Sequence, residues 1–228
     1  MLTASLGLSL DNKVFHRQAT NKPLTFRPHD PPLPVRTLSQ GADYAIVLTE
    51  DQRIYMAATD QVWTQRDKLL EKISAIQNVV KLDVWSHNGI LLKSDGSIVS
   101  WNTRRNSFLP DYPPGKKWKD VACGVLHYVG IDVDGNVTAW PVDPDLDDKV
   151  AHAAIAVPES AKRGAIRVKA ESTVSAVQRH DGTWTAWGHD FGHGLVGKIN
   201  QIGPAKDIAF RTSPPKATEL YWIEPKSE

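Results

Sequence analysis

A motif of about 18 residues recurs along the chain and constrains its fold more than any other feature of the sequence. Four copies align without gaps, and each has an aspartate at its seventeenth position and an apolar residue three positions later. Repeats spaced by about 40 to 50 residues are typical of propellers and solenoids, in which each copy is one supersecondary unit. The copies begin at Val35, Val79, Trp118 and Ala165, and their aspartates are Asp51, Asp95, Asp134 and Asp181.

The repeated aspartates predict hairpin turns. Asp95, Asp134 and Asp181 each precede a glycine, and Asp-Gly between alternating apolar runs is the strongest short-range hairpin signal. Asp11-Asn12 supplies a fifth match near the N-terminus. Three copies also have a tryptophan six residues after the aspartate, which we interpret as packing within the repeat. These tryptophans are Trp101, Trp140 and Trp187.

The sequence therefore predicts an all-β fold, a β-propeller of about five four-stranded blades with short helical insertions. A β-sandwich is the alternative, but a sandwich does not require one residue class at one offset in every copy. Half repeats at the two chain ends predict closure by pairing of the N- and C-terminal strands, which would remove exposed edges. We expect one domain over residues 1–228, with full repeats at 35–78, 79–117, 118–164 and 165–203 and half blades at 1–34 and 204–228.

Three segments lie outside this pattern. Gln65–Ile76 has helical apolar spacing, and Lys149–Val157 is a shorter candidate helix between an acidic run and Pro158. Each could cover a blade edge or carry recognition. The proline-rich residues 23–34 form an extended connector or a docking arm, and the apolar strand containing Tyr221 is not assigned to any blade.

Parts of three copies resemble the repeat of the regulator-of-chromosome-condensation family. The resemblance is carried by WTAWGHDFGHGLVG from Trp184, by Cys123-Gly124 with His127, and by the run from Leu92 to Trp101. It implies a propeller of four-stranded blades, usually seven in that family. Members of the superfamily promote nucleotide exchange on a small GTPase, inhibit β-lactamases, or belong to large assemblies or virions. Such a fold does not select one function.

Composition excludes several classes of protein. With 27 basic and 26 acidic residues the net charge is +1, so no dedicated nucleic-acid surface is expected. Cys123 is the one cysteine and cannot form an intramolecular disulfide. The sequence has no signal peptide and no apolar run of the roughly 20 residues that span a bilayer. We expect a protein that is cytoplasmic or lies within a macromolecular assembly.

No pattern indicates catalysis. His180, His189, Asp190 and His193 could ligate zinc, but the repeat itself explains most of this segment. The sequence contains no phosphate-binding loop and no nucleophile elbow. We therefore predict a non-enzyme with no catalytic residue, cofactor or metal.

The sequence offers a small set of candidate binding residues. Three tryptophans lie outside the repeated tryptophan position, two arginines follow the last strand of a repeat, and one histidine lies in a Gly-rich loop; packing or plain solvation is the alternative for each. The main hypothesis is a protein-binding or structural subunit of a larger complex, possibly also homo-oligomeric. A lectin-like propeller, or a regulatory or inhibitory binding protein of an enzyme or GTPase, is the alternative. The candidates are Trp63, Trp85, Arg104, Arg105, His189 and Trp222.

Overall fold

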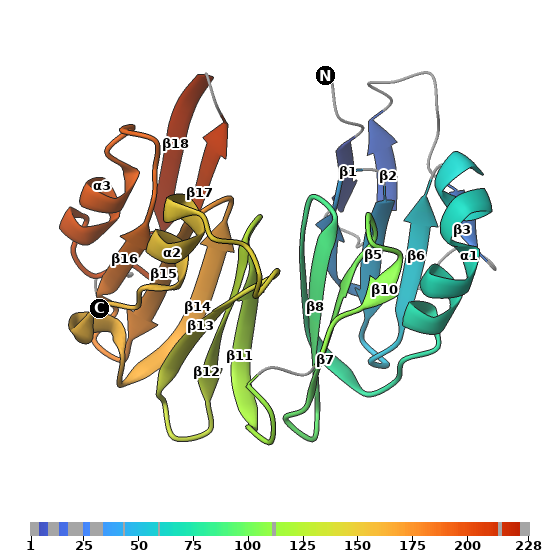
Figure 1. Ribbon diagram of the computed structural model, residues 1–228, viewed down its shortest axis with the longest axis horizontal. Coiled ribbons are helices and arrows are strands. Elements are labelled where there is room, and N and C mark those ends of the chain that lie inside the picture. Colours follow the sequence, from blue (N-terminus) through green and yellow to red (C-terminus); the bar gives the residue numbers. More distant parts are fainter. Residues whose placement is uncertain are drawn as a thin grey trace. The chain divides into compact units, whose positions relative to one another are not determined.

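The computed structural model describes the chain as antiparallel sheets with a few short helices, divided between two compact units (Figure 1). Unit 1 is Met1–Asp111 and unit 2 is Tyr112–Glu228. The described residues are 5–8, 14–17, 25–27, 34–42, 44–58, 60–110, 113–213 and 216–223.

Unit 1 contains a hairpin and two four-stranded sheets among its described residues. The sheets have the orders β3-β6-β5-β4 and β10-β9-β8-β7, and helix α1 (Asp60–Ser74) packs against β6. The strands are β1 (Ser5–Leu8), β2 (Val14–Arg17), β3 (Thr25–Arg27), β4 (Val35–Gln40), β5 (Tyr44–Thr49), β6 (Ile54–Ala58), β7 (Val79–Trp85), β8 (Asn88–Lys93), β9 (Ile98–Asn102) and β10 (Ser107–Phe108).

Unit 2 contains two three-stranded sheets and a hairpin among its described residues. A helix follows the third strand of each sheet, where the sequence predicts a fourth strand. The strands are β11 (Trp118–Cys123), β12 (His127–Asp132), β13 (Val137–Pro141), β14 (Ala165–Glu171), β15 (Val174–Arg179), β16 (Trp184–Gly188), β17 (Asp207–Ser213) and β18 (Lys216–Ile223). The helices are α2 (Lys149–Ile155), the 3-10 turn η1 (Glu159–Ala161) and α3 (Leu195–Gln201).

The four full copies of the repeat share their backbone irregularities as well as their strands. The residue after each repeat aspartate has a left-handed backbone, with φ of +64° at Gln52 and about +80° at the three glycines. Asp95 and Asp181 accept hydrogen bonds from the amides two residues later, at 2.9 Å in both turns. In the third copy, Asp132 rather than the repeat aspartate accepts the turn amides. A register shift also recurs between the first and third residues of β4, β7, β11 and β14.

Neighbouring first strands are joined within each unit. In unit 1 the Val84 amide donates to the Ser39 hydroxyl at 3.0 Å, and in unit 2 the Val168 amide donates to the Asp120 carboxylate at 2.8 Å. Lys169 on β14 continues the series with an ion pair to Asp207 on β17 at 2.7 Å. These contacts connect consecutive sheets as consecutive blades of a propeller are connected.

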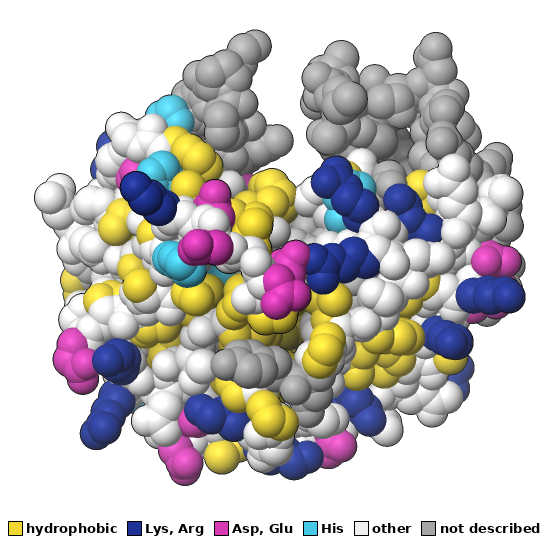
Figure 2. Space-filling view, in the orientation of Figure 1, with side chains coloured by type: hydrophobic (Ala, Val, Ile, Leu, Met, Phe, Trp, Pro, Cys, Tyr) yellow, Lys and Arg dark blue, Asp and Glu magenta, His cyan; other side chains and the backbone are white. Residues whose placement is uncertain are grey.

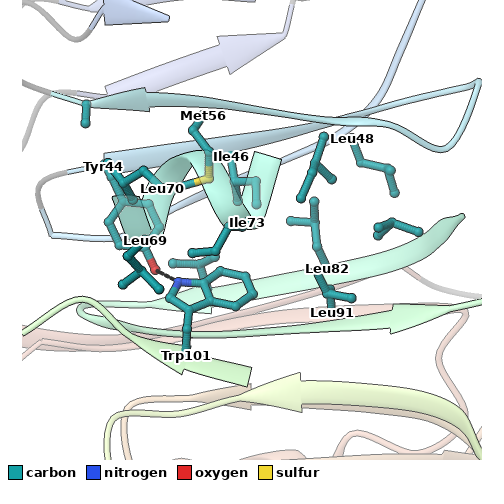
Figure 3. Close-up of a cluster of buried hydrophobic side chains, with 14 of the residues drawn as sticks. Tyr44, Ile46, Leu48, Met56, Leu69, Leu70, Ile73, Leu82, Leu91 and Trp101 are labelled. Atoms are coloured by element: carbon teal, nitrogen blue, oxygen red, sulfur yellow. Dashed lines mark hydrogen bonds between the residues drawn. The ribbon is translucent and has the colours of Figure 1, made fainter. Parts of the chain in front are cut away.

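The three repeat tryptophans are buried, which confirms their predicted packing role. In unit 1 the indole N–H of Trp101 donates to the Tyr44 hydroxyl at 3.2 Å, inside a cluster that α1 completes with Leu69, Leu70 and Ile73 (Figure 3). Gly89 lies against the Trp101 ring, where a Cβ would approach to 2.1 Å. This position therefore requires glycine because any side chain would displace the indole.

Two segments that the sequence left open have defined strand partners. Thr25–Arg27, within the proline-rich connector, is the strand β3 that pairs with β6. The Tyr221 segment is β18, in which Tyr221 and Trp222 face Ala209 and Ile208 of β17. Among the described residues, β1–β2 and β17–β18 are separate two-stranded sheets. Ring closure and the number of blades stay predictions.

Candidate partner-binding surface at one end of the sheets

The candidate surface lies at one end of each sheet, which we call the loop end. The turn between the first and second strands lies there, and so does the loop that follows the third strand. In unit 1 the pairs Trp85↔Asn88 and Asn88↔Asn102 form one row across the sheet. In unit 2 the equivalent row is Glu171↔Val174 and Val174↔Gly188. Loops on a rigid sheet are the usual place for binding residues.

In unit 1 the loop end is a tight, basic turn between β9 and β10. Asn102 holds it by donating from its side-chain amide to the Asn88 side chain at 2.6 Å and accepting the Arg105 amide at 2.8 Å. Asn106 has a left-handed φ of +53°, which asparagine tolerates well. Arg104 and Arg105 are exposed at the tip. The turn therefore presents two cations on a fixed backbone.

In unit 2 the loop after β16 presents an aromatic side chain. Phe191 is 44% exposed, although its φ of +54° is unfavourable for a bulky residue. Its amide donates to Nδ1 of His189 at 3.3 Å, and the two rings meet edge to face with centroids 4.7 Å apart. The Asp190 carboxylate accepts the amides of Gly192 and Val196 at 3.1 and 3.2 Å. The loop is thus fixed from both sides of the aromatic residue.

The loop after β13 is longer and acidic. Asp148 begins α2 as its N-cap and accepts the amides of Val150 and Ala151 at 2.7 and 3.0 Å. Leu146, two residues earlier, is 38% exposed. The loop therefore presents an apolar side chain next to carboxylates.

The two loops of unit 2 belong to neighbouring sheets and lie at the same end. The Val125 amide donates to the Ser172 carbonyl at 2.6 Å, which joins the two first turns. Helix α2, which leaves the acidic loop, packs against both β13 and β16, and Trp187 donates to the Ala154 carbonyl at 2.9 Å. In the part of Figure 2 that carries α2 and α3, acidic, basic, histidine and apolar side chains lie close together.

The structure groups some of the predicted binding residues and separates others. Trp85, Arg104 and Arg105 all belong to the loop end of one sheet in unit 1, where Trp85 is half-buried. His189 is exposed and belongs to the loop end in unit 2. Trp63 is on α1 and Trp222 on β18; their side chains lie outside the described residues. These six residues stay candidates.

Sequence reasoning missed Phe191 and Leu146. Both are large apolar residues flanked by aspartate, glycine or proline within a predicted loop. A loop of this kind cannot bury a large apolar side chain in a core. A large apolar residue between aspartate, glycine or proline was therefore the signal that could have identified both.

A buried serine–histidine pair joins the two full sheets of unit 2. Nε2 of His127 lies 2.6 Å from the Ser175 hydroxyl, and both side chains are fully buried. Burial lowers the pKa of His127 from 6.5 to about 4, so the imidazole is neutral near pH 7. Because neither side chain reaches solvent, the pair is part of the packed interface between the two sheets.

Grouped metal ligands and membrane-spanning helices are both absent from the described part of the chain. No group of three or more His, Cys, Asp or Glu side chains there is placed to hold a metal ion. No helix among these residues combines the length and apolarity that crossing a membrane requires.

The structure is similar to that of human WBSCR16, an RCC1-like protein, with a TM-score of 0.59 over 94% of this chain and 61% of that chain, at 13% identity. The likeness shows a fold of the β-propeller type. The ectodomain of the Physcomitrella patens receptor kinase CR4 also matches at a TM-score of 0.59, with 14% identity over 96% of this chain and 59% of that one. Yeast RCC1 (Prp20), solved with Kap60, matches at 0.48 and 16% identity over 79% and 48%.

This chain spans about three fifths of the human and moss chains. No family model matches the sequence, and no curated protein matches it either. At these identities the likeness shows the fold alone.

Proposed function

We propose that this chain is a non-catalytic propeller that binds a protein partner through its loop end, as a subunit or adaptor of a larger assembly in the cytoplasm or inside a particle. The observation that carries the proposal is Phe191, an exposed aromatic residue held in an unfavourable backbone conformation. A left-handed backbone costs a bulky residue of the order of 1–3 kcal/mol and persists only where the surrounding structure imposes it. Exposed aromatic residues on rigid supports are typical anchors of protein interfaces.

The differences between the loops favour a protein over a sugar. A lectin-like propeller repeats equivalent pockets from blade to blade. Here one loop end has two arginines and the other has aspartates, an aromatic residue and a leucine. Loops that differ in this way do not form equivalent sugar pockets, and their varied chemistry suits protein partners.

The experiment compares partner capture by three forms of the chain. The chain would be cross-linked in its source cells and purified as the wild type, as Phe191→Asn and as Val133→Ser. Val133 is 63% exposed in the turn between β12 and β13, at the opposite end of the sheet. We expect a stoichiometric partner with the wild type and Val133→Ser, and its loss with Phe191→Asn. A chain that is always alone, or that binds simple sugars at several equivalent sites on a glycan array, would contradict the proposal.

A further inference from the structure

The loop end of unit 2 combines apolar contact area with negative charge. Leu146 and Phe191 are two of the five large apolar residues that are clearly exposed among the described residues. They lie on loops of adjacent sheets whose first turns are joined by the Val125–Ser172 hydrogen bond. Two neighbouring loops of unit 2 thus each expose one large apolar side chain, and such side chains on adjacent loops are candidate contact residues.

The charge around these two residues is strongly unbalanced. Residues 141–149 and 189–194 contain five aspartates and one lysine, whereas the whole chain has a net charge of +1. Three of the carboxylates, on Asp143, Asp148 and Asp190, accept backbone amides and so stay fixed in place. Asp145 and Asp147 are exposed beside Leu146, and the Asp147 side chain is 96% accessible although its Oδ1 lies 3.7 Å from Nε2 of His152.

We propose that this surface binds a basic segment of the partner protein, with an apolar side chain of that segment against Phe191 and Leu146 and lysine or arginine side chains near Asp145 and Asp147. The inference rests on the proposed function and names the chemistry of the partner. Charge complementarity favours this occupant because the carboxylates repel nucleic acid, anionic lipid and acidic peptides alike. The apolar pair supplies the contact area, and the surrounding charge supplies selectivity and faster association.

The test is a selection of random linear peptides, displayed on phage, against the immobilised full chain. We expect enriched peptides that carry lysine or arginine on both sides of a leucine or aromatic residue. Their affinity, measured by fluorescence anisotropy with synthetic copies, should fall about tenfold with Phe191→Asn, the loss of one anchor contact. It should fall less with Asp145→Asn/Asp147→Asn, and that loss should shrink as salt is added because exposed charges are screened.

The matched control lies at the opposite end of the same sheet. Val133 and Asp134 are an exposed apolar residue and an exposed carboxylate in the β12–β13 turn, so Val133→Ser/Asp134→Asn removes the same chemistry from another surface. This control should leave peptide affinity unchanged. Asparagine tolerates the left-handed backbone at position 191, and unfolding in urea verifies that every variant is folded.

Each other outcome overturns the inference. Enrichment of acidic or uncharged peptides, no enrichment, or equal affinity for the wild type and Phe191→Asn would exclude a basic segment at this surface. A dimer whose formation requires Arg104 and Arg105 would replace the foreign segment by a second copy of the chain. If the peptide selection fails while cross-linking still recovers a stoichiometric partner, the proposed function stands and only the inferred chemistry falls.

Discussion

The loop ends of the two units differ although the strands beneath them follow one repeat. In unit 1 a left-handed Asn106, with φ of +53°, closes a short turn tipped by Arg104 and Arg105. In unit 2 a left-handed Phe191, with φ of +54°, lies in the loop between β16 and α3 and is exposed next to Asp190. Because asparagine tolerates this backbone and phenylalanine does not, the left-handed conformation costs more free energy at position 191 than at position 106. The comparison suggests that the repeat supplies the scaffold and that unit 2 gives up some stability to display an aromatic residue.

The first prediction concerns Trp101, the buried repeat tryptophan of unit 1, whose removal should cost more stability than any other change considered below. Trp101→Ala should lower the free energy of unfolding by about 3–5 kcal/mol because it empties a fully buried site and leaves the Tyr44 hydroxyl without its indole donor. Urea denaturation measures the change. Phe108→Ala, at a partly exposed residue of β10, is the control and should cost far less. A similar loss from both variants would mean that the repeat tryptophan is not a core residue.

A second prediction contrasts the residues that begin the second strands. Unit 1 has Tyr44 at this repeat position and unit 2 has His127, and each is hydrogen-bonded to the next sheet. Because burial lowers the folded-state pKa of His127 from 6.5 to about 4, the unfolded chain takes up a proton that the folded chain does not bind. Stability should therefore be full above pH 6.5 and fall as the pH drops to about 4, by about 3 kcal/mol in total.

Urea denaturation over this pH range tests that window. His127→Gln removes the titrating group and should flatten the profile between pH 6.5 and 4. A wild-type chain whose stability does not change over the window would show that His127 is protonated in the folded state or is not buried.

The helix that leaves the acidic loop of unit 2 depends on its cap. Asp148→Ala should cost about 1 kcal/mol because two amides of α2 lose their acceptor. Asp145→Ala, at an exposed position three residues earlier, should leave stability unchanged. Thermal unfolding compares the two variants, and equal midpoints would contradict the capping role.

The smallest effect comes from exchanging the two left-handed residues. Phe191→Asn should raise the free energy of unfolding, and Asn106→Phe should lower it, each by up to about 1 kcal/mol. Chemical denaturation of the two variants beside the wild type measures both signs. If Phe191→Asn destabilises the chain, the aromatic residue contributes packing and the cost assigned to its display is wrong.

The sequence predicts what repeats locally and misses what depends on distant segments. The Asp-Gly turns, the alternating strands and the helix within 65–76 follow from spacing alone, and α1 begins only a few residues before that prediction. The strand β3 could not be predicted because its partner β6 follows it by about thirty residues. The fourth-strand position of unit 2 is taken over by α2 and α3, whose sequences have apolar residues at helical spacing. The sequence also did not show which residue accepts the turn amides in the third copy, where Asp132 rather than Asp134 does so.

The candidate site was only partly predictable for a related reason. Arg104, Arg105 and His189 are polar residues in predicted loops, and the structure indeed places them at loop ends. Phe191 and Leu146 were overlooked because an apolar residue in a sequence is normally assigned to a core. Only the structure shows that the Phe191 backbone is left-handed and that its side chain is exposed rather than part of a core.

In the proposed complex the partner covers Phe191 and Leu146 at the loop end of unit 2, and it leaves the arginine turn of unit 1 open. Hydroxyl-radical footprinting of the chain, alone and with its co-purified partner, tests it most directly because Phe191 and Leu146 are accessible in the free chain. We expect protection of these two residues, with Val133 and the Arg104–Arg105 turn unchanged. Protection of the arginine turn, with Phe191 still fully reactive, would contradict it.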